Sequence, residues 1–262
     1  MRVTVLGCGA SGGVPVLGCR CAVCLSTDPR NRRRRASVLI EAADVRLLID
    51  ASPDLRAQLL DSATTRLDAV LFSHAHADHC HGIDDLRLVC RTIEAPLDAW
   101  ATADTLAELE RRFGYAFGSW DGTGAGAGGW FRPALVAHAI AGPFAVSGVT
   151  VRPFVQRHGP TMTTLGFRVG RFAYSTDVSD LDDDAFTALA GIDTWIVDCQ
   201  SRAPTYVHSH LERTLGWIAR VAPRRAVLTH MGHELDYDLL TAELPDGVEP
   251  AYDGLVIEPP AA

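Results

Sequence analysis

The chain has 262 residues, 47% of them hydrophobic and 21% charged, and its 32 acidic and 24 basic side chains give a formal net charge of -8 at pH 7. These values are ordinary for a globular protein and exclude wholesale disorder and a fibrous fold. No apolar run reaches the roughly 18 residues of a transmembrane helix, and the short apolar start is typical of a strand and not of a secretory signal. We therefore expect a cytoplasmic protein with no general attraction to nucleic acid or membranes.

Short apolar runs typical of strands are interspersed with amphipathic helical segments. The expected strands are Val3–Leu6, Ser37–Ala42, Val45–Asp50, Ala69–Ser73, Val149–Val155, Thr164–Val169, Arg171–Ser175, Thr194–Cys199, Ala226–Thr229 and Leu255–Glu258. The expected helices are Pro53–Asp61, Asp84–Thr92, Thr105–Phe113, Asp182–Ala190, Leu211–Ala222 and Tyr237–Leu244. Several strands precede the first helix, which disfavours a doubly wound parallel sheet and favours two sheets covered by outer helices. No linker separates two cores, so we expect one domain over residues 1–262.

Two glycine-rich segments and one arginine-rich segment call for separate interpretation. Residues 121–129 cannot pack a core and are expected to form a flexible surface loop. Gly7–Gly12 match the dinucleotide fingerprint G-x-G-x-x-G, but the residues after them do not favour the helix that such a site requires. We expect instead a bent loop beside an active site. The arginines of Arg30–Arg35 are interpreted as a solvated face, with a phosphate or nucleic-acid patch as the alternative.

Seven cysteines and the absence of a secretion signal argue against a disulfide framework. Cys19, Cys21 and Cys24 form a C-x-C-x2-C cluster that can place three thiolates on one ion, for which zinc is the usual choice. The segment itself lacks a fourth ligand, so a loop of buried or reactive thiols is the alternative. The other four lie singly in apolar surroundings and are expected to pack in the core: Cys8, Cys80, Cys90 and Cys199.

A dense block of potential metal ligands follows the apolar strand at Ala69–Ser73. It contains His74, His76, Asp78 and His79. An extended start projects the first two histidines to one side, whereas the aspartate and the third histidine begin a turn and can face a second position. One ion cannot easily use all four ligands, so the spacing indicates two neighbouring metals.

This H-x-H-x-D-H block resembles that of the metallo-β-lactamase superfamily, whose fold is an αββα sandwich of two mixed sheets flanked by helices. The resemblance implies three further ligands at strand ends. His158 would complete the first metal site with His74 and His76, and Asp177 would bridge the two metals. His230 would complete the second site with Asp78 and His79. Asp50 is expected to orient a ligand histidine by a hydrogen bond, and His81 and His138 match no ligand position.

Three segments are similar to the phosphoribosyl cyclic-phosphate phosphodiesterase (PhnP) family: Gly7–Pro15, the cysteine cluster and Leu228–His233. The resemblance extends over nearly the whole chain, from Val3 to Leu255. In that family three cysteines and a late histidine hold a structural zinc. The resemblance implies that His233 is the fourth ligand beside Cys19, Cys21 and Cys24. The zinc would then fix the loop that also carries His230.

The resemblance implies a phosphodiesterase in which two divalent ions, Zn or Mn with Fe or Ni as alternatives, activate a water molecule. The expected substrate is a small phosphodiester, such as phosphoribosyl 1,2-cyclic phosphate or a cyclic nucleotide-like compound. His210 matches the family's acid histidine and is expected to protonate the leaving group, and Asp78 is expected to be both a catalytic residue and a ligand. His208 is interpreted as a capping or solvent-facing histidine.

Competing hypotheses are a tRNA 3′-processing nuclease, a thiolester or lactam hydrolase, and a non-catalytic metal carrier related to cofactor biosynthesis. The acidic net charge disfavours the nuclease. A carrier has no need of an acid such as His210. We expect neither nucleic acid nor a membrane as a partner, and the sequence leaves a homodimer open.

Overall fold

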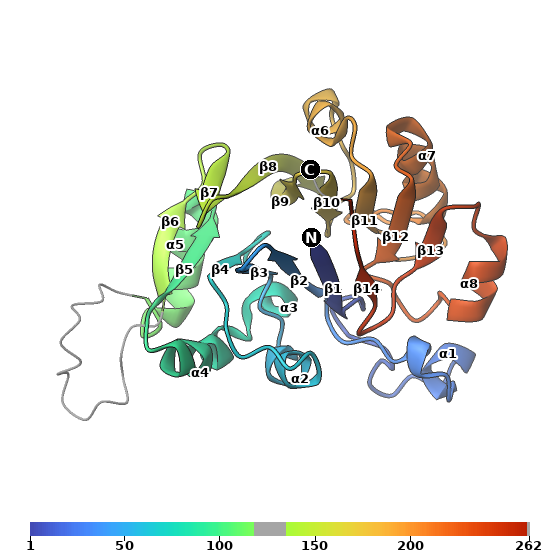
Figure 1. Ribbon diagram of the computed structural model, residues 1–262. Helices are drawn as coiled ribbons and strands as arrows, with labels where there is room; N and C mark the ends of the chain where they lie inside the picture. Colours follow the sequence, from blue (N-terminus) through green and yellow to red (C-terminus); the bar gives the residue numbers. More distant parts are fainter. Residues whose placement is uncertain (118–134, 261–262) are drawn as a thin grey trace.

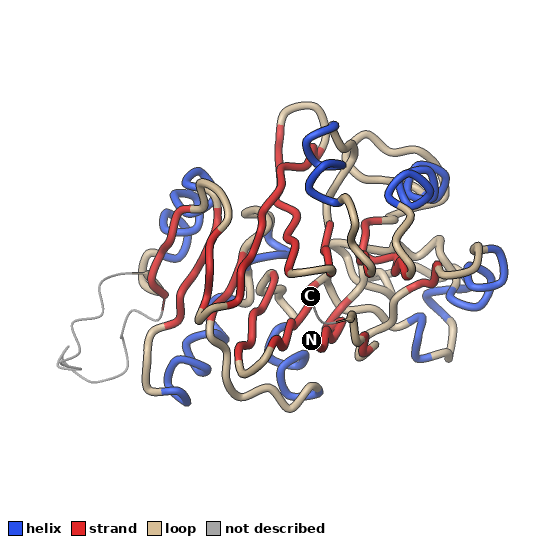
Figure 2. The backbone as a smooth tube through the Cα atoms, turned by 45° about the horizontal axis from the view of Figure 1, so that its top comes forward, coloured by secondary structure: helices blue, strands red, loops and turns tan. Residues whose placement is uncertain are grey.

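The computed structural model describes residues 1–117 and 135–260, and within them the chain forms two mixed β-sheets with helices on their outer faces (Figures 1 and 2). In this described part each sheet has seven strands. The first sheet has the order β14 (Val256–Ile257), β1 (Arg2–Gly7), β2 (Ser37–Ala42), β3 (Val45–Ile49), β4 (Ala69–Leu71), β5 (Leu97–Ala101) and β6 (Leu135–Ala139). The second has the order β13 (Val248–Pro250), β12 (Arg225–Thr229), β11 (Thr194–Asp198), β10 (Phe172–Ser175), β9 (Met162–Val169), β8 (Val149–His158) and β7 (Phe144–Val146).

The helices follow the capping and amphipathic signals of the sequence. They are α1 (Ala22–Leu25), α2 (Leu55–Asp61), α3 (Ala77–Cys80), α4 (Ile83–Ile93), α5 (Ala103–Phe113), α6 (Asp183–Leu189), α7 (Leu211–Val221) and α8 (Tyr237–Glu243), with a 3-10 turn at Pro29–Asn31. Thr102, Asp182 and Asp236 cap α5, α6 and α8 by accepting backbone N–H bonds. The expected αββα sandwich is therefore confirmed.

Two layers of apolar packing hold the sandwich together. The larger core fills the space between the sheets and continues beneath α6, α7 and α8. The second core lies between the outer face of the first sheet and helices α2, α4 and α5. Cys8 and Cys199 belong to the first core and Cys80 and Cys90 to the second, so the expected packing role of all four is confirmed.

The expected strands and helices are all present, with ends shifted by a few residues, but the four-residue helices α1 and α3 and four strands were missed. The missed strands are β5, β6, β7 and β13. Three of them are edge strands, and β7 and β13 have only three residues each, so they give little alternation to detect. The glycine-rich segment at 121–129 lies outside the described residues.

The loop after β1 contains no helix, as expected for a false dinucleotide fingerprint. Gly9 instead pairs with Met231 and donates its N–H to the carbonyl of Arg34. A Cβ atom on Gly9 would lie 2.7 Å from the carbonyl oxygen of Arg33, so the close approach of the two chain segments requires glycine here. The loop therefore packs the N-terminal segment against the residue that follows His230.

Candidate metal centre

The predicted ligands converge because several parallel strands end at one edge of the sandwich. The histidine block follows β4, and β3, β4 and β5 run parallel; Asp177 and His230 follow β10 and β12, which lie on either side of the parallel strand β11. A hydrogen bond from Leu165 N to Ser73 O joins the two sheets beside the block. Ligands more than 150 residues apart in sequence thus meet at one place.

Three residues at these strand ends adopt a left-handed backbone conformation that is unusual for side chains other than glycine. Asp50, Asp177 and His230 have φ angles of 63°, 53° and 56°. Such conformations cost free energy and persist where the surrounding structure fixes them, often at functional sites. Here they turn the chain sharply out of β3, β10 and β12 and direct a carboxylate, a carboxylate and an imidazole toward one centre.

The ligand atoms form two sets that share Asp177. The first set is His74, His76, His158 and Asp177, and the second is Asp78, His79, Asp177 and His230; within each set the atoms lie within 4.8 Å of one another. All members are buried except His76, which is exposed and opens the site to solvent. These are the two groups predicted from the sequence.

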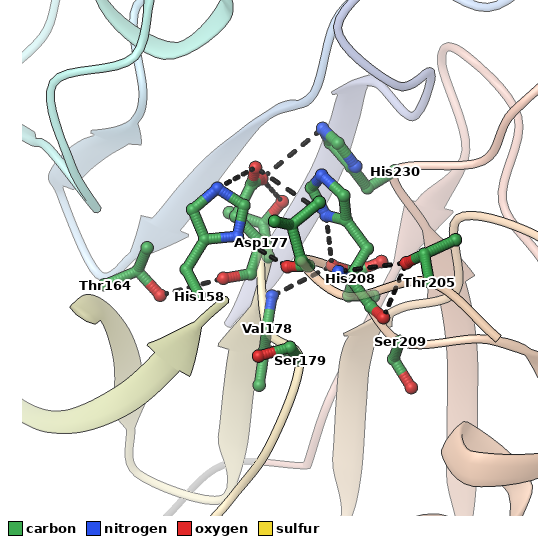
Figure 3. Close-up of polar contacts among 12 residues, drawn as sticks. His158, Thr164, Asp177, Val178, Ser179, Thr205, His208, Ser209 and His230 are labelled. Carbon is green, nitrogen blue, oxygen red and sulfur yellow. Dashed lines mark hydrogen bonds and ion pairs between the residues drawn. The ribbon is translucent and has the colours of Figure 1, made fainter. Parts of the chain in front are cut away.

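The carboxylate of Asp177 lies between His158 of the first set and His230 of the second (Figure 3). One of its oxygens lies nearer to each set. Its Oδ2 lies 3.8 Å from His74 Nε2 and 3.7 Å from His158 Nε2. Its Oδ1 lies 2.9 Å from His79 Nε2 and 3.4 Å from His230 Nε2. Asp177 therefore has the placement of a carboxylate that bridges two ions.

The donor set fits divalent metal ions. Tetrahedral coordination with metal–ligand bonds of about 2.0–2.2 Å separates neighbouring N and O ligands by about 3.4 Å, close to the distances around Asp177. The Nε2 atoms of His74, His79 and His230 are buried and have no hydrogen-bond partner with proper geometry. Buried polar atoms without a partner are rare and call for an explanation, and metal coordination would supply one.

Burial and neighbouring charges shift the pKa values of the side chains in the cluster. Burial alone would raise the pKa of Asp177, but the nearby His230 and His79 hold it well below its usual range. Burial lowers the pKa of His74, and neighbouring His79 lowers it further. These shifts favour an ionised Asp177 and a neutral His74, which are the forms that ligate a cation. Burial alone would lower the pKa of His79 and His230, but Asp177 in turn raises it, so binding of an ion at the second set would displace protons from these rings.

Hydrogen bonds to the far side of the rings fix the orientation of the ligands. The Nδ1 of His79 lies 2.7 Å from Asp50 Oδ2, as expected from the sequence. Asp50 also accepts bonds from the N–H and hydroxyl of Ser73. The Nδ1 of His158 lies 2.6 Å from the carbonyl oxygen of Val207. Such partners fix the ring so that Nε2 faces the ion.

His208 lies at the cluster, so its interpretation as a capping or solvent-facing histidine was wrong. Its side chain is buried, its ring stacks on His230 at 4.7 Å and lies 4.8 Å from the ring of His158. Its Nδ1 lies 3.1 Å from Asp198 Oδ2. Thr205 closes the turn that holds it, because its hydroxyl accepts the N–H of His208 and donates to its carbonyl. The sequence signal for this contact is the aspartate that ends β11, Asp198.

His210 occupies a different environment. It precedes α7, it is buried, and its Nδ1 has no hydrogen-bond partner. Burial lowers its pKa, and nearby Arg213 lowers it further. Among the described residues, no contact joins His210 to the histidine cluster. The geometry therefore favours His208 over His210 as the residue that can reach a substrate at this centre.

The cysteine cluster and His233 also come together as predicted. The Sγ atoms of Cys19, Cys24 and Cys21 lie 3.2, 3.7 and 3.9 Å from His233 Nδ1. With Zn–S bonds of about 2.3 Å and Zn–N bonds of about 2.0–2.1 Å, a tetrahedral site separates S and N by about 3.6 Å. The four side chains therefore fit a structural zinc.

Replacing Cys21 with serine is expected to release one zinc ion per chain and to lower the free energy of unfolding by several kcal/mol. Binding energy at a structural zinc site is also folding energy. Elemental analysis and thermal unfolding of the variant beside a Cys90→Ser control would test this, because Cys90 is buried in the core away from the cluster. An unchanged zinc content in Cys21→Ser would contradict the assignment.

The arginine segment forms the solvated face that the sequence suggested only in part, because Arg33 is buried and three of the other arginines are paired with acids. Arg30 pairs with Asp28 and Asp238, Arg34 with Asp61, and Arg35 with Asp54. Arg33 is buried, and Arg32 is exposed. The segment folds back on acidic residues and on the protein interior and leaves little positive charge for a polyanion.

His81 and His138 lie outside the ligand groups, in agreement with the sequence analysis. His81 contacts the ring of Phe113. His138 Nε2 lies 2.9 Å from Asp98 Oδ1, and its ring stacks on Trp100. None of the helices in the described part of the chain has the length and apolar content that crossing a bilayer requires.

Comparison with known proteins defines the class. The family model of the beta-lactamase superfamily domain matches residues 45–231. A diphosphatase from the PhnP family, known from its crystal structure, is 32% identical with a TM-score of 0.89, over 98% of this chain and 97% of that one. The chain therefore belongs to the metallo-β-lactamase superfamily. Within the superfamily it lies close to the PhnP family.

Two further proteins are also similar to this chain. Zinc-bound PqqB from Methylobacterium extorquens has a TM-score of 0.78 over 98% of this chain and 100% of that one, but at 22% identity it shows the fold alone. An octanoyltransferase from Porphyromonas gingivalis is 34% identical over 97% of this chain and 51% of its own length. The chain thus spans about half of that curated relative.

Proposed function

We propose that the protein is a metal-dependent phosphodiesterase that hydrolyses a small phosphodiester, in the first place a cyclic phosphate such as phosphoribosyl 1,2-cyclic phosphate or a cyclic nucleotide. The observation that carries the proposal is the carboxylate of Asp177 between two ligand sets, with a further histidine, His208, beside them. Two divalent ions bound there would lower the pKa of a shared water and neutralise charge on the phosphoryl oxygens. Phosphoryl transfer depends mainly on such positioning and charge stabilisation.

Other residues would position the metal ligands and the attacking water. Asp177 would hold the two ligand sets at a fixed separation, and Asp50 and Val207 would orient His79 and His158. Asp78 Oδ2, 3.3 Å from His79 Nε2 and 3.5 Å from His230 Nε2, would complete the second set. We also assign to Asp78 a hydrogen bond from the attacking water.

His208 would protonate the departing oxygen. Asp198 Oδ2 accepts the Nδ1–H of His208 and also the N–H of Val178, which fixes the carboxylate and the ring. This arrangement leaves Nε2 of His208 to carry a proton to the substrate. An aspartate that orients a histidine in this way also stabilises its protonated form.

A diphosphate ester is the second candidate substrate, favoured by the 32% identical PhnP-family relative, which is described as a diphosphatase. Hydrolysis of a diphosphate and of a cyclic diester makes the same demand on the centre: in-line attack at phosphorus and protonation or charge stabilisation of the leaving oxygen. The two candidates therefore differ in how the site accommodates the rest of the substrate.

Comparing kcat/KM values separates these candidates. They are measured with Mn²⁺ and with Zn²⁺ for cyclic nucleotides, linear dinucleotides and diphosphate esters. The highest value for a cyclic phosphate would support the first candidate, and the highest value for a diphosphate ester would support the second. No turnover of any of them or of bis(p-nitrophenyl) phosphate would favour a metal carrier. A chelator-treated sample is the control.

We expect binding of tRNA to be weak and its salt dependence to be shallow. Counterion release on RNA requires several free cationic side chains, whereas Arg30, Arg34 and Arg35 are paired with acids. A salt titration of tRNA binding by the parent chain and by an Arg32→Ala variant would test this. Steep salt dependence together with cleavage of a tRNA precursor would instead support the nuclease hypothesis.

A further inference from the structure

Arg33 is enclosed in the protein, unlike Arg32 beside it, and only 2% of its surface is exposed. Its guanidinium donates hydrogen bonds to the carbonyl oxygen of Gly232 at 3.0 Å and to that of Leu235 at 2.6 Å. A third bond runs to Asn31 Oδ1 at 3.1 Å. The side chain thus bonds the backbone segment Gly232–Leu235 at two points.

The segment Gly232–Leu235 follows His230 of the histidine cluster and contains His233 of the cysteine cluster, so it joins the two candidate metal centres. His230 of the histidine cluster lies two residues before Gly232, and His233 of the cysteine cluster lies between the two bonded carbonyls. Backbone bonds hold the other side of the segment, from Met231 to Cys8 and from Gly232 N–H to Gln200 O. The positions of both ligand histidines therefore depend on this segment.

Asn31 extends the contact beyond the guanidinium. Its side-chain oxygen accepts the backbone N–H of Tyr237 at 2.9 Å, and its amide donates to Asp236 Oδ2 at 2.8 Å. Asp236 caps α8, so the network runs from the arginine segment through Asn31 to the start of that helix. Asn31, which is itself held by Tyr237 and Asp236, therefore helps to fix the orientation in which the guanidinium of Arg33 bonds the two carbonyls.

The chemistry of this contact indicates a positional role. Among the described residues no ion pair joins Arg33 to an acid, so the direct polar contacts of the buried guanidinium are hydrogen bonds to neutral groups, while Asp253 and Asp236 act on it only from a distance. Burying a charge in this way is costly, and an apolar side chain would often fill such space with equal or better stability. An apolar side chain would, however, remove the side-chain donor of the Leu235 carbonyl and leave the Gly232 carbonyl with only the longer bond of 3.4 Å from the N–H of Leu235.

We propose that Arg33 is a positioning residue that fixes the turn between the two metal centres and thereby sets the position of His230. The proposal rests on the ligand sets assigned under the proposed function, and it does not depend on the substrate. The planar fork of arginine bonds two carbonyls and Asn31 at once, which lysine cannot reproduce with a single ammonium group.

Cobalt binding tests the proposal without an activity measurement. Co²⁺ is added to metal-free protein, and its visible d–d bands report the histidine and carboxylate sites, whereas its thiolate charge-transfer band reports the cysteine site. In Arg33→Lys we expect binding of the second Co²⁺ at the histidine cluster to weaken by about 10–100-fold, the range seen when groups that orient metal ligands are changed. Arg32→Lys, a matched change at the exposed neighbour, should bind Co²⁺ like the parent.

The outcomes are distinguishable. If Arg33→Lys folds, even with a lower Tm, and binds both ions with the parent's affinity, Arg33 is only structural and the proposal is overturned. If that variant does not fold, Asn31→Ala provides the second test, because it removes one anchor of the guanidinium; it should weaken the same ion, and parent-like binding would again overturn the proposal. If the parent itself shows no d–d bands, the assigned dinuclear centre fails as well.

Discussion

Replacing His208 with glutamine is expected to lower kcat on an alkyl phosphodiester by about 10²–10⁴-fold, the usual contribution of general acid catalysis. The imidazole lies against Asp198 and beside Asp177, where it can reach a leaving oxygen. With a p-nitrophenyl leaving group, which departs without a proton, the loss should be much smaller. Steady-state kinetics on both substrates, with metal content measured on the same samples, checks this.

His210→Gln is the matched control, since this histidine lies two residues away and before the same helix. Because no described contact joins His210 to the cluster, its replacement should leave the leaving-group dependence unchanged. Two results would contradict the assignment: an equal loss on both substrates in His208→Gln, or a leaving-group-dependent loss in His210→Gln. The second would restore the acid role that the sequence suggested for His210.

Replacing Asp177 with asparagine is expected to abolish measurable turnover, a loss of about 10³-fold or more, because assistance by metal ions is worth several kcal/mol of activation free energy. The two oxygens of this carboxylate face different ligand sets, and the amide would present a donor to one of them. At least one catalytic ion should be lost, while the zinc of the cysteine cluster stays.

Asp180→Asn is the control for this change. Asp180 lies in the same loop but is exposed, and it contacts Arg157 only through its backbone. It should keep parent-like metal content and kcat. Retention of both catalytic ions by Asp177→Asn, measured by elemental analysis, would show that this carboxylate does not bridge them.

The histidine and aspartate ligands could be predicted from the sequence because they follow apolar runs at strand ends. The block at His74–His79 is dense enough to be recognised locally, and the resemblance to the PhnP family supplied the distant members. The structure brings all eleven predicted ligand side chains into the three groups described above. That metal ions occupy them stays a prediction.

What the sequence could not provide were contacts that depend on tertiary structure. His208 and His210 differ in role because a turn closed by Thr205 turns one ring toward Asp198. A run of arginines suggests a solvated face, yet burial of Arg33 depends on carbonyls about 200 residues away. Neither partner is marked in the local sequence, since carbonyl groups are common to every residue.

The most direct test of a dinuclear phosphodiesterase is a titration with Mn²⁺. The protein is first freed of its exchangeable ions, and hydrolysis of a cyclic nucleotide is followed as Mn²⁺ is added. The structure offers two ligand sets around Asp177, so we predict that activity rises steeply only as the second equivalent binds and is lost again on chelation. Full activity at one equivalent, or no hydrolysis at any level of Mn²⁺ or Zn²⁺, would contradict this account.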